Sequence, residues 1–317
     1  MPGSAARTLA NVPTLLQPRE VPLGGPRAMT VRRTLPHREL RTVGAWCFAD
    51  DYGPDRTRMV LPPHPHTELQ TVSWLLEGDL VHQDSVGSEQ LVQPGGLSLM
   101  TAGRGIAHAE TSTVSADVLR GLQLWVALPF ASRRVAPHYE HHAELPTYVA
   151  PGVVATVFLG SLGDVRSPAT AYSPIVGADA VLSGAAVLPL DPSWEYAVLA
   201  LEPGLAVDGV ELPVAALRYF PPGRSELPVG GTSRAVLLGG QPFGEELVMW
   251  WNFVGRSHED IAAARADWDA AMTGETTRFG AVPYELPWIP APPLPAVRLR
   301  PRGADRRLSA PRPPERR

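Results

Sequence analysis

The sequence predicts an all-β protein built from two antiparallel β-sandwich or β-barrel domains, followed by one C-terminal helix. Short apolar runs recur along the chain with turn-forming residues between them, which is typical of sheets made of many short strands. The 317 residues include 29 Gly and 35 Pro, and this richness favours turns over long helices. The strand rhythm occurs twice, on either side of a polar stretch, which indicates a duplicated domain.

The first set of strands predicts an N-terminal domain over residues 17–130, after a disordered segment over residues 1–16. Its apolar runs are "VGAWCFAD", "LQTVSWLL", "LVHQD", "LSLMTAG" and "GLQLWVALP". Turn sequences such as "EGD", "SVGS" and "QPGG" separate them. The polar stretch over residues 131–150 is predicted to be an interdomain linker.

The second set predicts a C-terminal domain over residues 151–288, closed by a helix over residues 257–272. Ser257 and Asp260 have the spacing of a capping box at the start of this helix. Its apolar stripe, expected to pack on a barrel, contains Ile261, Ala264, Trp268 and Met272. The segment over residues 289–317 is rich in Pro and Arg, and we expect it to be a disordered tail.

Composition limits the partners of the chain. The tail carries eight Arg against Asp305 and Glu315, a balance of +6, so the net charge of −4 leaves −10 on the rest of the chain. Such an acidic body disfavours specific binding of nucleic acid. Cys47 is the only cysteine, which excludes a disulfide within the chain. No apolar run is long enough for a membrane span, and we expect a cytoplasmic monomer.

Two short motifs carry the chemistry. His64 and His66 in "PPHPHTE" are two residues apart, and so are His108 and Glu110 in "GRGIAHAE". Residues at this spacing point to the same face of a strand. Two such pairs on neighbouring strands can meet inside a barrel. Three imidazoles and one carboxylate suit a divalent first-row metal, namely Fe, Mn, Ni, Co, Cu or Zn.

The same alternation predicts what surrounds this site. Counting forward from His66 without a bulge places four residues on the ligand face: Gln70, Val72, Trp74 and Leu76. Ile106 shares a face with His108 and Glu110, whereas Ala107 and Ala109 lie on the opposite face and allow close packing. The ligands are therefore expected to open onto an apolar pocket.

The remaining histidines are weaker candidates. His82 has the parity of the ligand face, and we expect it to make a structural hydrogen bond or to support a ligand. His138, His141 and His142 are expected to be solvated residues of the linker. Beyond them the only histidine is His258, so the second barrel is predicted to hold no three-histidine site.

The segments "PPHPHTELQTVSWLLEGDLVHQDSVG" and "PGGLSLMTAGRGIAHAE" resemble the paired motifs of pirins, a branch of the cupin superfamily. The resemblance extends over roughly residues 17–288. It implies a bicupin, two antiparallel jelly-roll barrels with a metal in the N-terminal one only. It also implies that His64, His66, His108 and Glu110 are the ligands and that the ion is Fe(II). Gln70 stands where general cupins have a Glu, but this position is not a ligand in pirins.

Some pirins are quercetinases, so the resemblance implies a metal-dependent dioxygenase that cleaves a flavonol or a similar enolic or phenolic compound with O₂ and releases CO. Glu110 is the catalytic candidate, because a ligand carboxylate can also take the hydroxyl proton of the substrate. The alternative is a non-catalytic, metal- or redox-dependent regulator that binds a protein partner, as other pirins do. An exposed apolar patch would favour that second interpretation.

Overall fold

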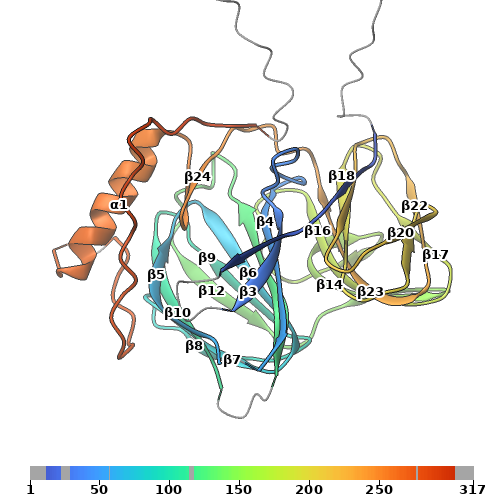
Figure 1. Ribbon diagram of the computed structural model, residues 1–317, viewed down its shortest axis with the longest axis horizontal. Coiled ribbons are helices and arrows are strands. Elements are labelled where there is room, and N and C mark those ends of the chain that lie inside the picture. The colour runs from blue at the N-terminus through green and yellow to red at the C-terminus, as the bar shows by residue number, and fades with distance from the viewer. Residues whose placement is uncertain (1–11, 23–28, 57, 114–117, 276–277, 304–317) are drawn as a thin grey trace, which may run out of the picture.

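The computed structural model describes residues 12–22, 29–56, 58–113, 118–275 and 278–303. These residues form two β-barrels side by side and one helix at the outer side of the N-terminal barrel (Figure 1). The prediction of an all-β fold with two antiparallel barrels and a C-terminal helix is confirmed. No helix of the described residues is long and apolar enough to cross a bilayer.

The N-terminal barrel consists of a seven-stranded and a four-stranded sheet. The larger sheet has the order β12-β9-β6-β11-β4-β3-β2 and the smaller one β5-β10-β7-β8. The strands of the larger sheet are β2 (Arg19–Pro22), β3 (Thr30–Leu35), β4 (Trp46–Asp55), β6 (Leu69–Glu77), β9 (Leu97–Thr101), β11 (Leu119–Ala127) and β12 (His138–His142). Those of the smaller sheet are β5 (Val60–His66), β7 (Leu80–Asp84), β8 (Glu89–Val92) and β10 (Ile106–Ser112).

The C-terminal barrel repeats this plan. Its larger sheet has the order β1-β21-β18-β23-β16-β14-β13, with β15 paired to β14, and its smaller sheet β17-β22-β19-β20. The larger sheet contains β1 (Thr14–Leu16), β13 (Thr147–Ala150), β14 (Val153–Leu162), β15 (Val165–Arg166), β16 (Ile175–Ser183), β18 (Glu195–Ala200), β21 (Leu217–Phe220) and β23 (Thr232–Gly240). The smaller sheet contains β17 (Ala186–Pro189), β19 (Leu205–Val207), β20 (Val210–Leu212) and β22 (Glu226–Gly230).

The two larger sheets pack face to face and form the main core of the molecule. Val72 and Trp74 of β6 and Leu124 of β11 lie in one buried cluster with Phe158 and Leu238 of the second barrel. The rings of Trp74 and Phe158 stack with centroids 5.0 Å apart. Each larger sheet is covered by the other larger sheet on one face and by its own barrel on the other. Residues that point to either face are therefore buried, and those between the two sheets are apolar.

Three boundary predictions differ from the structure. Residues 14–16, expected to be disordered, form β1 and pair with β21 of the C-terminal barrel. Residues 131–150, expected to be a linker, contain β12, which pairs with β9, and β13, which pairs with β14. The segment "HYEHH" lacks the apolar residues that reveal a strand, because at the edge of the sheet all five of its residues stay partly exposed. Residues 1–11 of the 1–16 prediction lie outside the described residues.

The C-terminal segment was predicted to be disordered from residue 289, and this is wrong for residues 289–303. The backbone N–H of Ile289 donates to the carbonyl of Pro63, and Leu247 and Arg302 form a β-bridge. Ala291 is buried. Proline lacks a backbone N–H and disfavours helices and central strands, but it does not prevent an extended chain from packing. The prediction for residues 304–317 lies outside the described residues.

Helix α1 (His258–Met272) begins as predicted, but it does not close the C-terminal barrel. The hydroxyl of Ser257 accepts from the N–H of Asp260, and the carboxylate of Asp260 accepts from the N–H of Ser257, which completes the capping box. The helix packs on the hairpin of β24 (Val248–Trp250) and β25 (Phe253–Gly255), at the outer face of β10 (Figure 1). Its buried residues are Ile261, Ala264, Trp268 and Ala271.

Met272, predicted to be the last residue of that apolar stripe, is exposed, and Ala271 takes its place. Strand β10 explains why the helix packs on the N-terminal barrel. Ala107 and Ala109 are buried in the same cluster as Phe253 and Trp268, as expected for small residues that allow close approach. The helix therefore supports the strand that carries His108 from behind.

Candidate metal centre

Strands β5 and β10 bring the two sequence motifs together. They pair antiparallel, with His108 opposite His64 and Ile106 opposite His66. Directly paired residues share a face, so the three histidines point into the barrel from adjacent strands. The register shifts between His108 and Glu110, so that Glu110 pairs with Leu61 rather than Pro62. This shift moves the carboxylate along the strand relative to the imidazoles.

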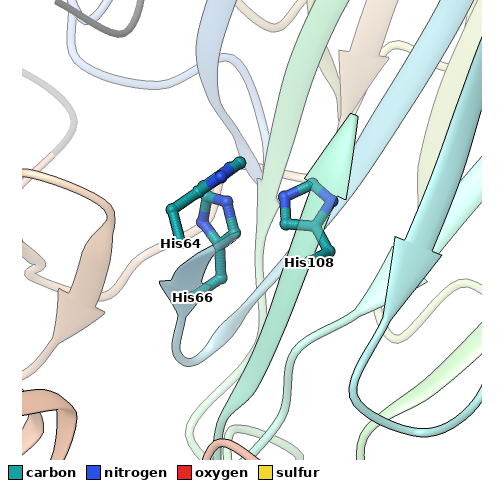
Figure 2. Close-up of side chains that lie close together, drawn as sticks. All are labelled: His64, His66 and His108. Atoms are coloured by element: carbon teal, nitrogen blue, oxygen red, sulfur yellow. The ribbon is translucent and has the colours of Figure 1, made fainter. Parts of the chain in front are cut away.

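The three imidazoles form a compact buried cluster (Figure 2). One nitrogen of each ring lies within 4.8 Å of the corresponding nitrogens of the other two. The ring centroid of His64 is 4.3 Å from that of His108 and 5.1 Å from that of His66. The exposed fractions are 7 % for His64, 2 % for His66 and 1 % for His108.

Backbone carbonyls determine the tautomers of His64 and His66. Nδ1 of His64 lies 2.9 Å from the carbonyl oxygen of Pro62, and Nδ1 of His66 lies 3.1 Å from that of Asn252. A carbonyl can only accept, so each Nδ1 carries the proton and donates it. The lone pair of each neutral ring is then on Nε2. Asn252 belongs to the β24–β25 hairpin, which therefore orients a site residue.

Burial keeps these rings neutral. Desolvation lowers the pKa of His64, and it lowers the pKa of His66 and of His108 well below the usual value. For His66 and His108 the neighbouring rings lower the pKa further, whereas for His64 the hydrogen bond to Pro62 and the negative charge of Glu110 oppose the lowering of the pKa. Neutral imidazole is the form that binds metals.

Glu110 belongs to a second, overlapping cluster. Its carboxylate lies within 4.8 Å of ring nitrogens of His82 and His108, all three residues being buried. One oxygen, Oε1, accepts a hydrogen bond of 2.9 Å from the hydroxyl of Ser73. The structure thus brings three of the four predicted ligands into one group, and it places Glu110 beside His108 but outside that group. It also adds His82, which the sequence indicated only by parity.

The donor set fits a divalent first-row transition ion. Nε2 of His108 is buried and has no hydrogen-bond partner among the described residues, which is costly for a polar atom in the absence of a ligand. Three neutral imidazoles with an adjacent carboxylate suit Fe, Mn, Ni, Co, Cu and Zn. Both histidine clusters found in the described part of the chain lie in the N-terminal barrel.

The predicted lining of the site is wrong along β6. Glu68, between β5 and β6, has a positive φ of 56°, and this residue shifts the alternation by one position. Val72 and Trp74 therefore face the second barrel, and the side-chain amide of Gln70 donates to the carbonyl of Thr170 there. Ser73 faces the metal centre instead. A single residue in the left-handed region cannot be recognised from the alternation of apolar residues, so the sequence did not predict this shift.

The wall of the site is partly aromatic and was not identified from the sequence. Trp125 of β11 lies with its ring centroid 5.2 Å from that of His66, in an edge-on arrangement. Phe48 of β4 stacks on Trp125 with centroids 4.1 Å apart. Ile106 is buried in the same cluster as both aromatic residues, as expected.

The linker histidines belong to β12 and to neither histidine cluster of the described residues. His141 contacts the carbonyl of Leu97 through Nδ1, and Nε2 of His142 lies 3.2 Å from the carboxylate of Glu140. They are half-buried rather than solvated. Two cavities, of about 1210 and 780 Å³, are lined by residues other than the metal-centre histidines.

Family models match both barrels. The model described as pirin matches residues 28–126, and that of the pirin C-terminal cupin domain matches residues 179–274. A Pseudomonas aeruginosa protein, provisionally named a quercetin 2,3-dioxygenase, is 42% identical over 286 residues, covering 87% of this chain and 89% of its own. Human pirin is 29% identical over 259 residues, covering 77% of this chain and 88% of its own.

Solved structures of similar proteins have the same fold. The crystal structure of a quercetin 2,3-dioxygenase from Acinetobacter baumannii has a TM-score of 0.85 and 35% identity, covering 90% of this chain and 97% of that chain. A pirin from Escherichia coli in complex with nickel(II) shares the fold, with a TM-score of 0.58 and 18% identity, over 73% of this chain and 99% of that one. Because the matched models cover both barrels and the sequence identity extends over most of the chain, this protein belongs to the pirin family.

Proposed function

We propose that the protein is a metal-dependent dioxygenase of the quercetinase type, which cleaves a flavonol or a related enolic or phenolic compound with O₂. The ion is held by His64, His66 and His108, with Glu110 as the adjacent carboxylate. Fe(II) is the first candidate ion, and Mn, Ni, Co, Cu and Zn suit the same donors.

The observation that carries this proposal is how the ring nitrogens of the three imidazoles are hydrogen-bonded. The Nδ1 atoms of His64 and His66 are both bound to backbone carbonyls, so their lone pairs are available on Nε2, and Nε2 of His108 lacks a partner among the described residues. Buried histidines that serve only in packing are normally hydrogen-bonded at their polar atoms. The similarity to quercetin 2,3-dioxygenases supports the reaction class.

Glu110 is suited to accept the hydroxyl proton of the substrate. Its Oε1 atom is held by the hydroxyl of Ser73, which leaves Oε2 for a proton. The carboxylate is only 3 % exposed, so bulk water does not compete for it. A divalent ion held by the three histidines would supply Lewis acidity and a path for electrons between substrate and O₂.

Trp125 and Phe48 give the site an aromatic wall that suits an aromatic substrate. They stack on each other, and the guanidinium of Arg33 lies 4.2 Å from the ring centroid of Phe48 on its other side. Arg33 is in turn held by two hydrogen bonds of 2.7 Å to Asp50. A braced aromatic pair offers a planar ring contact at little cost in side-chain entropy.

The test is oxygen uptake by Fe(II)-loaded protein with a flavonol, with loss of flavonol absorbance recorded in parallel. Glu110→Gln should lose activity by more than its loss of metal explains, whereas Glu226→Gln, on an exposed position of the second barrel, should be unaffected. Elemental analysis should find close to one transition ion per chain, and His64→Ala combined with His108→Ala should remove it. Oxygen uptake no faster than with the free ion would contradict the enzymatic proposal.

A non-catalytic regulator is a second candidate, and one observation favours it. Val149, Val154 and Val181 are directly paired across β13, β14 and β16, and they are 68 %, 46 % and 52 % exposed. Three valines are far smaller than a typical interface side of about 800 Å². If this row binds a partner, replacing all three with Thr should abolish capture of that partner from cell extract and leave oxygen uptake unchanged.

A further inference from the structure

His82 and Asp84 lie beside the metal centre, on the strand next to β10. On β7, His82 is paired with Glu110 and Asp84 with His108 of β10. Both side chains are almost completely buried, with 1 % of His82 and none of Asp84 exposed. The ring of His82 stacks on that of Tyr139 from β12, with centroids 4.3 Å apart and an angle of 15° between the planes. This stacking and the contact of its Nε2 atom with Asp84 restrain the orientation of the His82 ring.

Asp84 is a fixed carboxylate. Its Oδ1 atom accepts the backbone N–H groups of Val86 and Ser88, each at 2.9 Å, and its Oδ2 atom lies 3.1 Å from Nε2 of His82. Burial raises the pKa of Asp84, but hydrogen bonds from His82 and Ser88 outweigh it and leave the pKa below its usual value. A carboxylate only accepts, so Nε2 of His82 carries a proton.

This assignment propagates to His108. With a single proton, held on Nε2 by Asp84, His82 has its lone pair on Nδ1, which lies 3.4 Å from Nδ1 of His108. The distance is long for a hydrogen bond, but the two atoms face each other within a buried pair of rings. Nδ1 of His108 is thus the donor, and the lone pair of His108 is on Nε2. That atom is the one with no partner among the described residues.

We propose that Asp84 and His82 are positioning residues that set the tautomer of His108 and so make its Nε2 atom a metal ligand. We call this chain of contacts from Asp84 through His82 to His108 the relay. His64 and His66 need no relay, because the carbonyls that they contact can only accept. His108 faces a second imidazole, which can donate or accept, and the contact of Asp84 with Nε2 of His82 removes that ambiguity. The inference rests on the proposed metal site and extends it to two residues outside the ligand set.

Asp84→Asn is the discriminating variant. The side-chain oxygen of the new residue keeps the two backbone N–H groups, so its NH₂ group faces Nε2 of His82 and donates to it. His82 then carries its proton on Nδ1 and donates a hydrogen bond to Nδ1 of His108. The proton of His108 must therefore be on its Nε2 atom. Replacing an aspartate that orients a histidine is known to trap the wrong tautomer in this way.

The first measurement is Co(II) affinity, by competition with a chromogenic chelator. Asp84→Asn should weaken binding by about 10–100-fold, the usual effect of losing a group that orients a ligand. His82→Asn should weaken it less, because the oxygen of the shorter side chain can accept from Nδ1 of His108. In the double variant, Asp84→Asn should add no further loss. Asp179→Asn removes a buried carboxylate of the other barrel, and it should reduce stability without changing affinity.

The second measurement needs no metal. Nitrogen-15 chemical shifts of the histidine rings in apo protein should show Nε2 of His108 unprotonated in the wild type and protonated in Asp84→Asn. The Co(II) absorption band at saturation should have the same shape in wild type and His82→Asn. If His82→Asn changes the band and loses as much affinity as His64→Ala, His82 is itself a ligand and the relay is wrong.

The outcomes also separate the relay from the proposed function. Wild-type protein that binds Co(II) while Asp84→Asn binds within threefold of it would overturn the relay alone. Wild-type protein that binds no Co(II) would contradict the proposed function, and the ring shifts of apo protein would still decide the tautomer. If Asp84→Asn does not fold, an unprotonated Nδ1 of His108 in the wild type suffices to overturn the relay.

Discussion

At the scale of single residues, the metal centre depends on what holds the far side of each ligand. Pro62 and Asn252 supply carbonyls to two imidazoles, and Ser73 supplies a hydroxyl to the carboxylate of Glu110. Supporting contacts of this kind fix ring orientation and basicity. The hydroxyl of Ser73 also lies 3.0 Å from the side-chain amide of Gln123. An amide NH₂ group can donate to this hydroxyl while the hydroxyl donates its one proton to Glu110.

Ser73→Ala is expected to lower kcat for flavonol oxidation about tenfold while leaving metal content unchanged, because a hydrogen bond to a charged group contributes about 1.5–3 kcal/mol. Without this bond, the carboxylate is free to rotate away from the substrate hydroxyl. The measurement is oxygen uptake at saturating flavonol, with elemental analysis of the same sample. Ser167→Ala removes a buried hydroxyl of the second barrel and is the matched control. A metal loss that accounts for the whole decrease would mean that Ser73 supports binding of the ion rather than the position of the base.

At the scale of elements, segments distant in sequence hold the strand that carries His64 and His66. The N–H of Ile289 donates to the carbonyl of Pro63, and the hydroxyl of Thr67 donates to the carbonyl of Val254. The indole of Trp268 in α1 donates to the carbonyl of Ile289. The helix and the C-terminal segment therefore form one layer behind β5 and β10.

Truncation after Trp288 is expected to lower the free energy of unfolding by about 5 kcal/mol. The hydrogen bonds that it removes include the two of Ile289, the two between Leu247 and Arg302, and the one that the Arg265 guanidinium makes to Pro292, at about 1 kcal/mol each. Chemical denaturation monitored by tryptophan fluorescence measures the change. Val297→Ser, at a position that is 72 % exposed, should have no effect. A truncated chain as stable as the full one would show that residues 289–303 contribute nothing to the fold.

At the scale of the whole molecule, the two barrels are joined by polar contacts as well as by their shared apolar core. The indole of Trp46 donates to the carbonyl of Val176, and that of Trp74 donates to the carboxylate of Asp179. The carboxylate of Glu195 accepts from the N–H of Gly44 at 2.6 Å and from the hydroxyl of Tyr219 at 2.7 Å. Such groups make each barrel depend on the other for its satisfied hydrogen bonds.

Glu195 predicts a pH dependence of stability. Burial raises its pKa above the usual 4.5, although Tyr219 and Gly44 oppose the shift. Between the unfolded and the folded pKa, the folded state holds more protons, so stability falls as pH rises through this window. Glu195→Gln should therefore show a smaller fall in unfolding free energy from pH 4.5 to neutral pH than the wild type does.

Denaturation curves at a series of pH values measure this difference. Glu226→Gln removes the same charge from an exposed strand position, and it should follow the wild-type profile. Parallel profiles for Glu195→Gln and the wild type would show that the buried carboxylate is not destabilised by the barrel interface.

The sequence by itself determined the two barrels, the start of the helix and the meeting of His64 and His66 with His108. Each rests on a local rule: alternation along a strand, the capping box of Ser257 and Asp260, and the shared face of residues two apart. These rules act over a few residues, so neighbouring sequence suffices to reveal them.

Only the tertiary structure decided what surrounds the metal centre. Because Glu68 is in the left-handed region, Ser73 rather than Val72 points towards the ligands. Contacts with β10 and the β24–β25 hairpin place α1 on the N-terminal barrel. His82 and Asp84 became partners of His108 because β7 pairs with β10. These outcomes depend on register and on contacts between distant segments, and a one-residue change in register moves every side chain to the opposite face of its sheet.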